Sequence, residues 1–134
     1  MPAFILHDDV KSDFLRIAVK SPSARGRILA ALEAASEDQT LLDQLQSNRY
    51  RTYGEHDTDI KRWVLARQLG YDIHRFRFFY LEENGFCYRI IYAYDDVYDE
   101  CHILAILRRD EIDYDDPNHP FNARIFAAYH SLGL

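Results

Sequence analysis

The sequence predicts an α+β fold in which an antiparallel sheet packs against an N-terminal helical hairpin and a C-terminal helix. Two observations support this prediction. Residues 8–45 repeat apolar side chains at helical spacing, whereas residues 71–107 repeat them with the period of two that is typical of strands. The chain of 134 residues has the length of one domain, and 48% of it is hydrophobic, which is enough to fill a core. We therefore expect residues 1–134 to form a single domain with the element order β-α-α-β-β-β-α.

The first part of the chain predicts a strand followed by two helices. Residues 3–7 are apolar enough for a short strand, and Asp8 or Asp9 is expected to cap the helix that follows. Ser21-Pro22 marks the start of the next helix, because serine suits the cap and proline suits the first helical position. The two helices are expected to form a hairpin, with a short helical piece after it at residues 41–45.

The rest of the chain predicts three strands and a last helix. Residues 47–60 are polar and are expected to form a loop, whereas residues 63–69 fit either a helix or a strand. Asn84-Gly85 is the strongest short signal for a hairpin between two strands. Strands joined by hairpins form an antiparallel meander, whose apolar face the helices must cover. The expected strands are 71–80, 86–94 and 101–107, and the expected helix is 122–132.

Composition argues against several classes of protein. No apolar run approaches the roughly 20 residues that span a bilayer, and the acidic pair Asp8-Asp9 comes too early for a signal peptide. We therefore expect a cytoplasmic protein that does not interact with a membrane. Cys87 and Cys101 are expected to be buried free thiols, because thiols stay reduced in the cytoplasm and their spacing is not that of a metal site. No metal and no cofactor are expected.

Charge is distributed unevenly along this acidic chain, whose net charge is −6. Residues 61–94 contain six basic and three acidic residues, whereas residues 95–118 contain two basic and nine acidic residues. A uniformly basic chain would indicate nucleic-acid binding directly, and this chain is not one. A local basic surface can still bind phosphate, although the negative net charge does not favour long-range attraction of RNA.

Several arginines are expected to gather on one face of the sheet. Side chains alternate across a strand, so Arg75 and Arg77 lie on the same face. Folding the hairpin about residue 83 places residues whose numbers sum to about 166 opposite each other, which brings Arg77 near Arg89. The next hairpin brings the end of the third strand toward Arg89, and only one of Arg108 and Arg109 can share its face.

Such a group of like charges costs free energy unless something negative offsets it. Repulsion between neighbouring cross-strand charges amounts to roughly 0.2–1 kcal/mol per pair. Phosphate is a natural partner, because the guanidinium fork matches its oxygens and stays protonated. Acids at residues 110–116 or on a partner protein would serve as well. The alternative is that these are surface arginines, each paired with a local carboxylate.

Three segments resemble the strand signature of the RelE/ParE toxin superfamily, the toxins of bacterial type II toxin–antitoxin systems. The first alternates basic and apolar residues, the second reads Tyr-Arg-apolar-apolar-Tyr, and the third is an apolar run that ends in two arginines and an acid. The predicted helices before and after them fall in compatible places, so the resemblance implies a RelE-like domain. The segments are residues 72–78, 88–92 and 103–110.

The RNA-cleaving members of this family imply an activity. They are mRNA interferases, which cut messenger RNA on the ribosome without a metal and thereby stop translation and growth. The ribose 2′-OH attacks the adjacent phosphate and leaves a 2′,3′-cyclic phosphate. The resemblance therefore implies that this chain is a toxin with endoribonuclease activity.

The resemblance also implies a role for each residue that matches by position. Arg75 and Arg77 would orient the phosphate and favour loss of the 2′-OH proton. Arg89 would contact the phosphate as charge builds on it, and Arg109 would be the other phosphate-binding arginine. Tyr114 lies near the place of a late tyrosine that stacks on a base or assists proton transfer. Fixed cations where the transition state gains charge suit such a reaction.

Some features depart from the pattern of the family. The chain has a pI of about 5.4, whereas ribosome-dependent toxins are usually basic. Arginine is a poor proton acceptor, so His74 or His102 could act as acid or base instead, although His74 is expected on the apolar face. Arg108 stands beside Arg109 and is expected to bind RNA phosphate with it.

Three functions remain open at this point. The first is RNA cleavage, the second is non-enzymatic inhibition of DNA gyrase in the manner of ParE, and the third is a plain protein-interaction domain whose arginines pair with an acidic segment. Basic residues at the matched positions favour cleavage, whereas the overall acidity favours binding. All three predict a protein partner, and for a toxin this is an antitoxin that folds over the sheet on binding.

Overall fold

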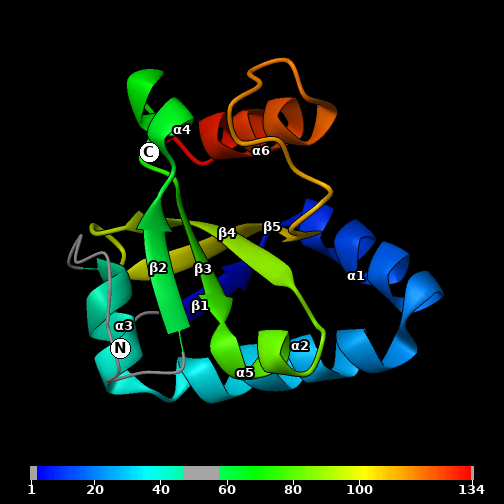
Figure 1. The fold of residues 1–134 in the computed structure, drawn as a ribbon. Coiled ribbons are helices and arrows are strands. Elements are labelled where there is room, and N and C mark those ends of the chain that lie inside the picture. Colours follow the sequence, from blue (N-terminus) through cyan, green and yellow to red (C-terminus); the bar gives the residue numbers. More distant parts are fainter. Residues whose placement is uncertain (1–2, 47–57, 134) are drawn as a thin grey trace.

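The sheet has five strands in the order β1-β5-β4-β3-β2, and helices lie on both of its faces (Figure 1). The computed structural model describes residues 3–46 and 58–133. β1 runs parallel to β5, and each of the other neighbouring pairs is antiparallel. The strands are β1 (Ala3–Leu6), β2 (Thr58–Arg62), β3 (His74–Phe78), β4 (Tyr88–Asp95) and β5 (Glu100–Arg108). The helices are α1 (Asp8–Lys20), α2 (Pro22–Ser36), α3 (Gln39–Gln46), α4 (Val64–Gln68), α5 (Phe79–Glu83) and α6 (Pro120–Ser131).

The predicted α+β class is confirmed, but the predicted element order is incomplete. Strand β2 begins at Thr58, within the stretch that the sequence predicts to be a loop, and it pairs with β3 at the edge of the sheet. The earlier part of that predicted loop, residues 47–57, lies outside the described residues. The segment at 63–69, which fitted either a helix or a strand, contains helix α4. None of the helices in the described ranges is long and apolar enough to cross a membrane.

The register predicted for the first hairpin is confirmed. His74, Arg75 and Phe76 of β3 lie opposite Tyr92, Ile91 and Ile90 of β4, so each pair of residue numbers sums to 166. The alternating apolar side chains of β3 disfavour a shift by one residue, because such a shift would turn its aromatic residues away from the core.

The segment between β3 and β4 is a helical turn and not the predicted two-residue hairpin. Helix α5 ends at Glu83, and Gly85, two residues beyond it, has a φ of 85°. The N–H of Phe86 donates to the carbonyl of Leu81 at 2.8 Å, and the N–H of Gly85 donates to the carbonyl of Glu82 at 3.0 Å. These bonds form a Schellman cap, which needs a residue with positive φ and so uses glycine. Gly85 therefore ends a helix here, where the sequence predicted a strand-to-strand turn.

The cap of helix α1 also differs from the prediction, which placed it at Asp8 or Asp9. His7 is the cap residue, and its Nδ1 accepts a hydrogen bond from the N–H of Asp9 at 3.1 Å. Asp8 and Asp9 instead lie in the first turn, where their negative charge is favourable at the positive end of the helix dipole. The predicted start of α2, with Ser21 at the cap and Pro22 at the first position, is confirmed.

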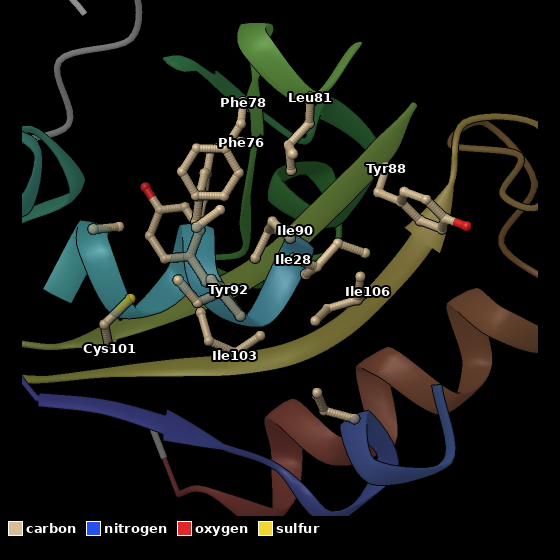
Figure 2. Packing of buried hydrophobic residues seen from close by; sticks show 14 of the residues in the cluster. Ile28, Phe76, Phe78, Leu81, Tyr88, Ile90, Tyr92, Cys101, Ile103 and Ile106 are labelled. Carbon is tan, nitrogen blue, oxygen red and sulfur yellow. The ribbon is translucent and has the colours of Figure 1, made fainter. Parts of the chain in front are cut away.

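The larger core fills the space between the sheet and helices α1, α2 and α3 (Figures 1 and 2). Figure 2 shows side chains of β3, β4 and β5 meeting Ile28 of α2, with Leu81 of α5 entering from the end of the sheet. The smaller core lies on the opposite face, below α4 and α6, so helices cover both faces and not the single face that was predicted. Its members include Trp63, Ile91, Leu107, Ile125 and Phe126.

Helix α1 closes an edge of β5 that would otherwise be open. Strand β1 pairs only with the first four residues of β5, Glu100–Ile103. Beyond them, the Oδ2 of Asp13 accepts a hydrogen bond from the N–H of Ile106 at 3.0 Å, and Arg16 donates to the carbonyl of Ile106 at 3.3 Å. Side chains of α1 thus take the hydrogen-bonding place of a neighbouring strand, which prevents edge-to-edge pairing with another chain.

Candidate functional site

Three arginines from two neighbouring strands lie on the face of the sheet that carries the smaller core. Arg75 and Arg77 alternate with the buried residues His74, Phe76 and Phe78 of β3, so they project from the face opposite to the larger core. Arg89 of β4 is paired with Leu107 of β5, which belongs to the smaller core. Only 8% of Arg89 is exposed, although it carries a full charge.

Glu82 of α5 joins Arg77 to Arg89. One carboxylate oxygen, Oε2, lies 2.9 Å from Nη1 of Arg77, and the other oxygen, Oε1, accepts a hydrogen bond from Nη1 of Arg89. The predicted closeness of Arg77 and Arg89 is therefore observed, and a single carboxylate bridges them. This arrangement offsets part of the repulsion between two guanidinium groups on neighbouring strands.

Tyr114 covers the remaining arginine. The guanidinium carbon of Arg75 lies 4.0 Å from the centre of the Tyr114 ring, which is the geometry of a cation–π contact. Trp63 also holds the tyrosine in place. Its Nε1–H donates to the Tyr114 carbonyl at 2.9 Å, and the two rings meet edge to face with centroids 5.6 Å apart. We refer to Arg75, Arg77, Glu82, Arg89 and Tyr114 together as the arginine site.

Two polar atoms of the arginine site are buried without a hydrogen-bond partner among residues 3–46 and 58–133. They are Nε of Arg75 and the hydroxyl oxygen of Tyr114. Burial raises the pKa of Tyr114, and the interaction of its hydroxyl with the Arg75 side chain, together with the positive charges of Arg75 and Arg89, only partly opposes this effect. The phenol is therefore protonated at neutral pH and can act as a hydrogen-bond donor. Buried polar atoms without partners are uncommon in proteins, and here they lie beside cations that attract an anion.

The cross-strand neighbours of these arginines include one more acidic residue. In the ladder between β2 and β3, Asp59 lies opposite Arg77 and Lys61 lies opposite Arg75. The arginine site thus lies in the part of the sheet where basic residues from β2, β3 and β4 are adjacent. The uneven charge along the sequence, with its basic excess at residues 61–94, corresponds to this part of the fold.

Arg108 and Arg109 lie at the end of β5. Because consecutive side chains of a strand project from opposite faces, these two arginines point to different sides of the sheet. Arg108 is paired with Tyr88, which belongs to the larger core, and its Nε lies 3.2 Å from the carboxylate of Asp110. The N–H of Arg109 donates to the carbonyl of Cys87 at 3.0 Å, which continues the ladder by one residue. Arg109 therefore projects from the same face of the sheet as Arg89, whereas the sequence could not decide between Arg108 and Arg109.

Both of these arginines line a hollow of about 280 Å³ at the end of the β4–β5 ladder. Ser21, Phe86, Tyr88 and Asp110 also line this hollow, whereas Arg75, Arg77, Arg89 and Tyr114 do not. The structure therefore brings four of the six predicted site residues together in the arginine site and places Arg108 and Arg109 beside a different depression.

Neither histidine considered as an acid or base lies in the arginine site. His74 is 4% exposed on the opposite face of the sheet, where its ring stacks on Tyr92 and its Nε2 lies 2.7 Å from Asp72. The expectation that His74 faces the core is confirmed. His102 lies near the other end of β5, and its Nε2 is 3.2 Å from a carboxylate oxygen of Glu100.

One group of side chains has the composition of a metal site. Ligand atoms of Asp95, Glu100 and His102 lie within 4.8 Å of one another. These groups already have partners within the protein, because Asp95 accepts hydrogen bonds from the N–H groups of Val97 and Tyr98, and Glu100 pairs with His102. The hydrogen bonds of a β-turn and the contact between Glu100 and His102 account for this cluster.

The two cysteines are free thiols, as the sequence predicts. Cys101 is buried, and burial raises the pKa of its thiol, so it is unreactive at neutral pH. Cys87 is half-buried, which differs from the expected full burial. It lies where β4 begins, and its carbonyl accepts the hydrogen bond from Arg109.

Sequence reasoning missed Glu82, which it assigned to a turn. The available signal was the spacing of Phe78 and Leu81, which are three residues apart and both buried, as on one face of a helix. Because Leu81 turns toward the larger core, the next residue is directed to the arginines. The position of Glu82 between two of them depends on this helical turn.

Comparison of the chain with family models, with curated proteins and with solved structures found no match. The arginine site offers three fixed positive charges, a phenol that can donate a hydrogen bond and aromatic rings beside them. Such a set can bind a phosphate and stabilise negative charge that develops on it.

Proposed function

We propose that this chain is the toxin of a bacterial type II toxin–antitoxin pair, with a RelE-like topology and an endoribonuclease activity on ribosome-bound messenger RNA. One observation supports this proposal above the others. Arg75, Arg77, Arg89 and Tyr114, the residues that match the family by position, lie together on one face of the sheet. These residues come from β3, β4 and the loop before α6, so their positions in the sequence alone do not require them to be close in space.

The arginine site suits the chemistry of RNA cleavage by transesterification. In this reaction the 2′-OH loses its proton to solvent as the 2′-oxygen forms a bond to phosphorus, and the bond from phosphorus to the 5′-oxygen breaks. The leaving 5′-oxygen takes up a proton from solvent, so the products carry a 2′,3′-cyclic phosphate and a 5′-hydroxyl. Negative charge on the phosphate oxygens increases in the transition state, and Arg75, Arg77 and Arg89 would stabilise it. The protonated Tyr114 would donate a hydrogen bond to a phosphate oxygen or to the leaving oxygen.

The proposal gives each part of the arginine site a share in the reaction. Removal of a single positioned donor to a developing oxyanion lowers rates by about 100- to 1,000-fold in well-studied enzymes. Arg89 is the most buried of the three arginines, so its charge is the least screened by water. We therefore expect its loss to have the largest effect on RNA cleavage.

The proposed partner is an antitoxin that covers the arginine site. The arginine site accepts a carboxylate, because Glu82 already bridges two of its arginines. An acidic segment of an antitoxin would bind by the same chemistry, and it would exclude RNA without contacting every arginine. This observation also fits a plain protein-interaction domain, which is the second candidate function.

Growth of bacteria that express the chain alone tests the proposal. The wild-type chain is expected to stop growth, and Arg89→Ala is expected to restore it. Arg25→Ala is a matched control, because Arg25 is an exposed arginine of α2 far along the chain from the arginine site. Circular dichroism of the purified variants should show that both are folded.

Mapping of RNA ends after induction separates the candidate functions. Cuts in phase with codons, with a 5′-hydroxyl on the downstream fragment, would support cleavage on the ribosome. Intact RNA together with DNA-damage signalling would instead identify DNA gyrase as the target. If the chain is harmless and binds acidic peptides but neither cuts RNA nor inhibits gyrase, the toxin function is rejected and the protein-interaction domain remains as the candidate function.

A further inference from the structure

Glu82 occupies the place between Arg77 and Arg89 that an anionic ligand would take. Its two carboxylate oxygens each accept a hydrogen bond from a different guanidinium group. Two oxygens of a phosphate group would make the same pair of contacts, because carboxylate and phosphate both fit the guanidinium donors. The carboxylate of Glu82 is therefore chemically a substitute for a ligand.

Burial keeps this contact closed to solvent. The side chains of Glu82 and Arg89 are 17% and 10% exposed, and that of Arg77 is 26% exposed. A phosphate cannot reach the same Nη1 atoms while the carboxylate lies on them. An ion pair that is mostly shielded from water is also screened less by salt than a surface pair.

The carboxylate can leave without unfolding the segment that carries it. Helix α5 is anchored by Leu81, which is 5% exposed within the larger core, and its end is fixed by the cap at Gly85. The carboxylate of Glu82 is connected to this helix through three rotatable side-chain bonds. Rotation about them removes the carboxylate from the arginines and leaves α5 in place.

Two further polar atoms of the arginine site are not bound by Glu82. Nε of Arg75 and the hydroxyl oxygen of Tyr114 are buried without a hydrogen-bond partner among the described residues, and the charge of Arg89 acts on the same phenol. The carboxylate has two oxygens, and both are used by Arg77 and Arg89. A phosphate has further oxygens that can accept hydrogen bonds from these two donors.

We propose that Glu82 is an internal competitor for the arginine site, and that a phosphate group binds there by displacing its carboxylate from Arg77 and Arg89. This inference rests on the proposed function only for the source of the phosphate, which is RNA. The displacement itself requires no cleavage. Without a ligand, Glu82 offsets the repulsion between the two arginines, and with a ligand the phosphate takes over that role.

The neighbouring residue Glu83 provides a matched control. It carries the same charge on the same helix, but it is exposed and lies in the last position of α5. Glu83→Gln therefore changes the net charge of the protein as much as Glu82→Gln does. Only Glu82→Gln removes the carboxylate that bridges the arginines.

The experiment measures the binding of inorganic phosphate to the full-length chain and to these two variants. Fluorescence of Trp63, the single tryptophan, is a suitable signal, because this residue contacts Tyr114. Glu82→Gln is expected to bind phosphate about tenfold more tightly than the wild type, the change that loss of one close competing charge can produce. Glu83→Gln is expected to change the affinity by less than about twofold. Equal affinities of the two variants, or no phosphate binding by any of the three proteins, would overturn the inference.

A measurement on the wild-type chain covers the case in which Glu82→Gln does not fold. During a phosphate titration, the carboxyl carbon resonance of Glu82 is expected to move toward the value of a free glutamate side chain. Phosphate binding that leaves this resonance unchanged would overturn the inference. Displacement of Glu82 without RNA cleavage in cells would reject the proposed function alone, and RNA cleavage with an undisplaced Glu82 would reject the displacement alone.

Discussion

Arg124 of α6 binds both carboxylate oxygens of Asp13 in α1, although 111 residues separate them in the sequence. Its Nη1 lies 2.8 Å from Oδ1 and its Nη2 lies 2.9 Å from Oδ2. Asp13 is fully buried, and Arg16 and the N–H of Ile106 bind the same carboxylate. One acidic side chain therefore ties the first helix, the last helix and the edge of β5 together.

Replacement of Asp13 by asparagine is expected to destabilise the fold strongly. The substitution keeps the shape of the side chain but leaves two arginines without their shared negative charge. Breaking a buried ion pair by removing one partner costs about 3–5 kcal/mol. Urea denaturation followed by circular dichroism should show this loss of unfolding free energy.

Asp8→Asn is the control for this prediction. Asp8 is in the same helix, but its side chain is 93% exposed and lies 3.7 Å from Lys11. Such a surface pair contributes about 0.5 kcal/mol or less. Similar losses for the two variants would contradict a structural role that is specific to Asp13.

Stability at alkaline pH is expected to depend on Tyr94. Burial, followed by the hydrogen bond that its hydroxyl donates to Asp99, raises the pKa of Tyr94 above the ordinary tyrosine value. The folded chain thus keeps this proton at a pH where the unfolded chain, with a tyrosine pKa of about 10, has lost it. The contribution of Tyr94 is fully present below pH 10 or so and is lost as the pH rises from there toward the folded pKa.

Tyr94→Phe tests this pH dependence. The variant loses one hydrogen bond, so it is expected to be less stable than the wild type by about 0.5–1.5 kcal/mol at pH 8. The difference between the two should shrink between pH 10 and pH 11, because only the wild type still contains a group that favours unfolding on deprotonation. A constant difference in urea denaturation across this range would contradict the raised pKa.

Local patterns in the sequence predict the part of the fold that holds the arginines. The alternation in β3 and the position of the turn give the register of β3 against β4 and hence the closeness of Arg77 and Arg89. These features depend on side-chain period and on nearby residues. Edge strand β2 was missed because residues 58–62 carry three charged side chains and few apolar ones, and such an edge strand has a weak apolar pattern.

Other features of the fold and of the candidate site depend on contacts that no local pattern shows. Asp13 follows Val10 at helical spacing, so an acid on an apolar face was visible, but its partner Arg124 is far away in the sequence. Gly85 was read as part of a hairpin turn, because positive φ is required both there and at a helix end. Because Gly85 in fact caps helix α5, Glu82 lies on that helix and pairs with Arg77 and Arg89.

Tyr114→Phe separates the catalytic role of the hydroxyl from the structural role of the ring. The ring still faces Arg75, and the hydroxyl that is lost lies beside that arginine without a hydrogen bond of normal geometry to any of the described residues. Removing such a buried, unpaired group is expected to leave the unfolding free energy unchanged or to raise it by up to about 1 kcal/mol. RNA cleavage is expected to fall by roughly 100- to 1,000-fold, because the phenol no longer donates a hydrogen bond to the phosphate or to the leaving oxygen.

Tyr114→Leu completes this comparison, since it removes the ring as well. The loss of the contacts with Arg75 and Trp63 is expected to cost about 2–4 kcal/mol in urea denaturation. Cleavage rates should be measured with purified protein and ribosome-bound messenger RNA. If Tyr114→Phe kept the full rate while only Tyr114→Leu lost it, the tyrosine would act by holding Arg75 in position and not by donating a hydrogen bond. If Tyr114→Phe lost stability as well as activity, its hydroxyl would have a partner in the folded protein, and its effect on cleavage would no longer indicate a catalytic role.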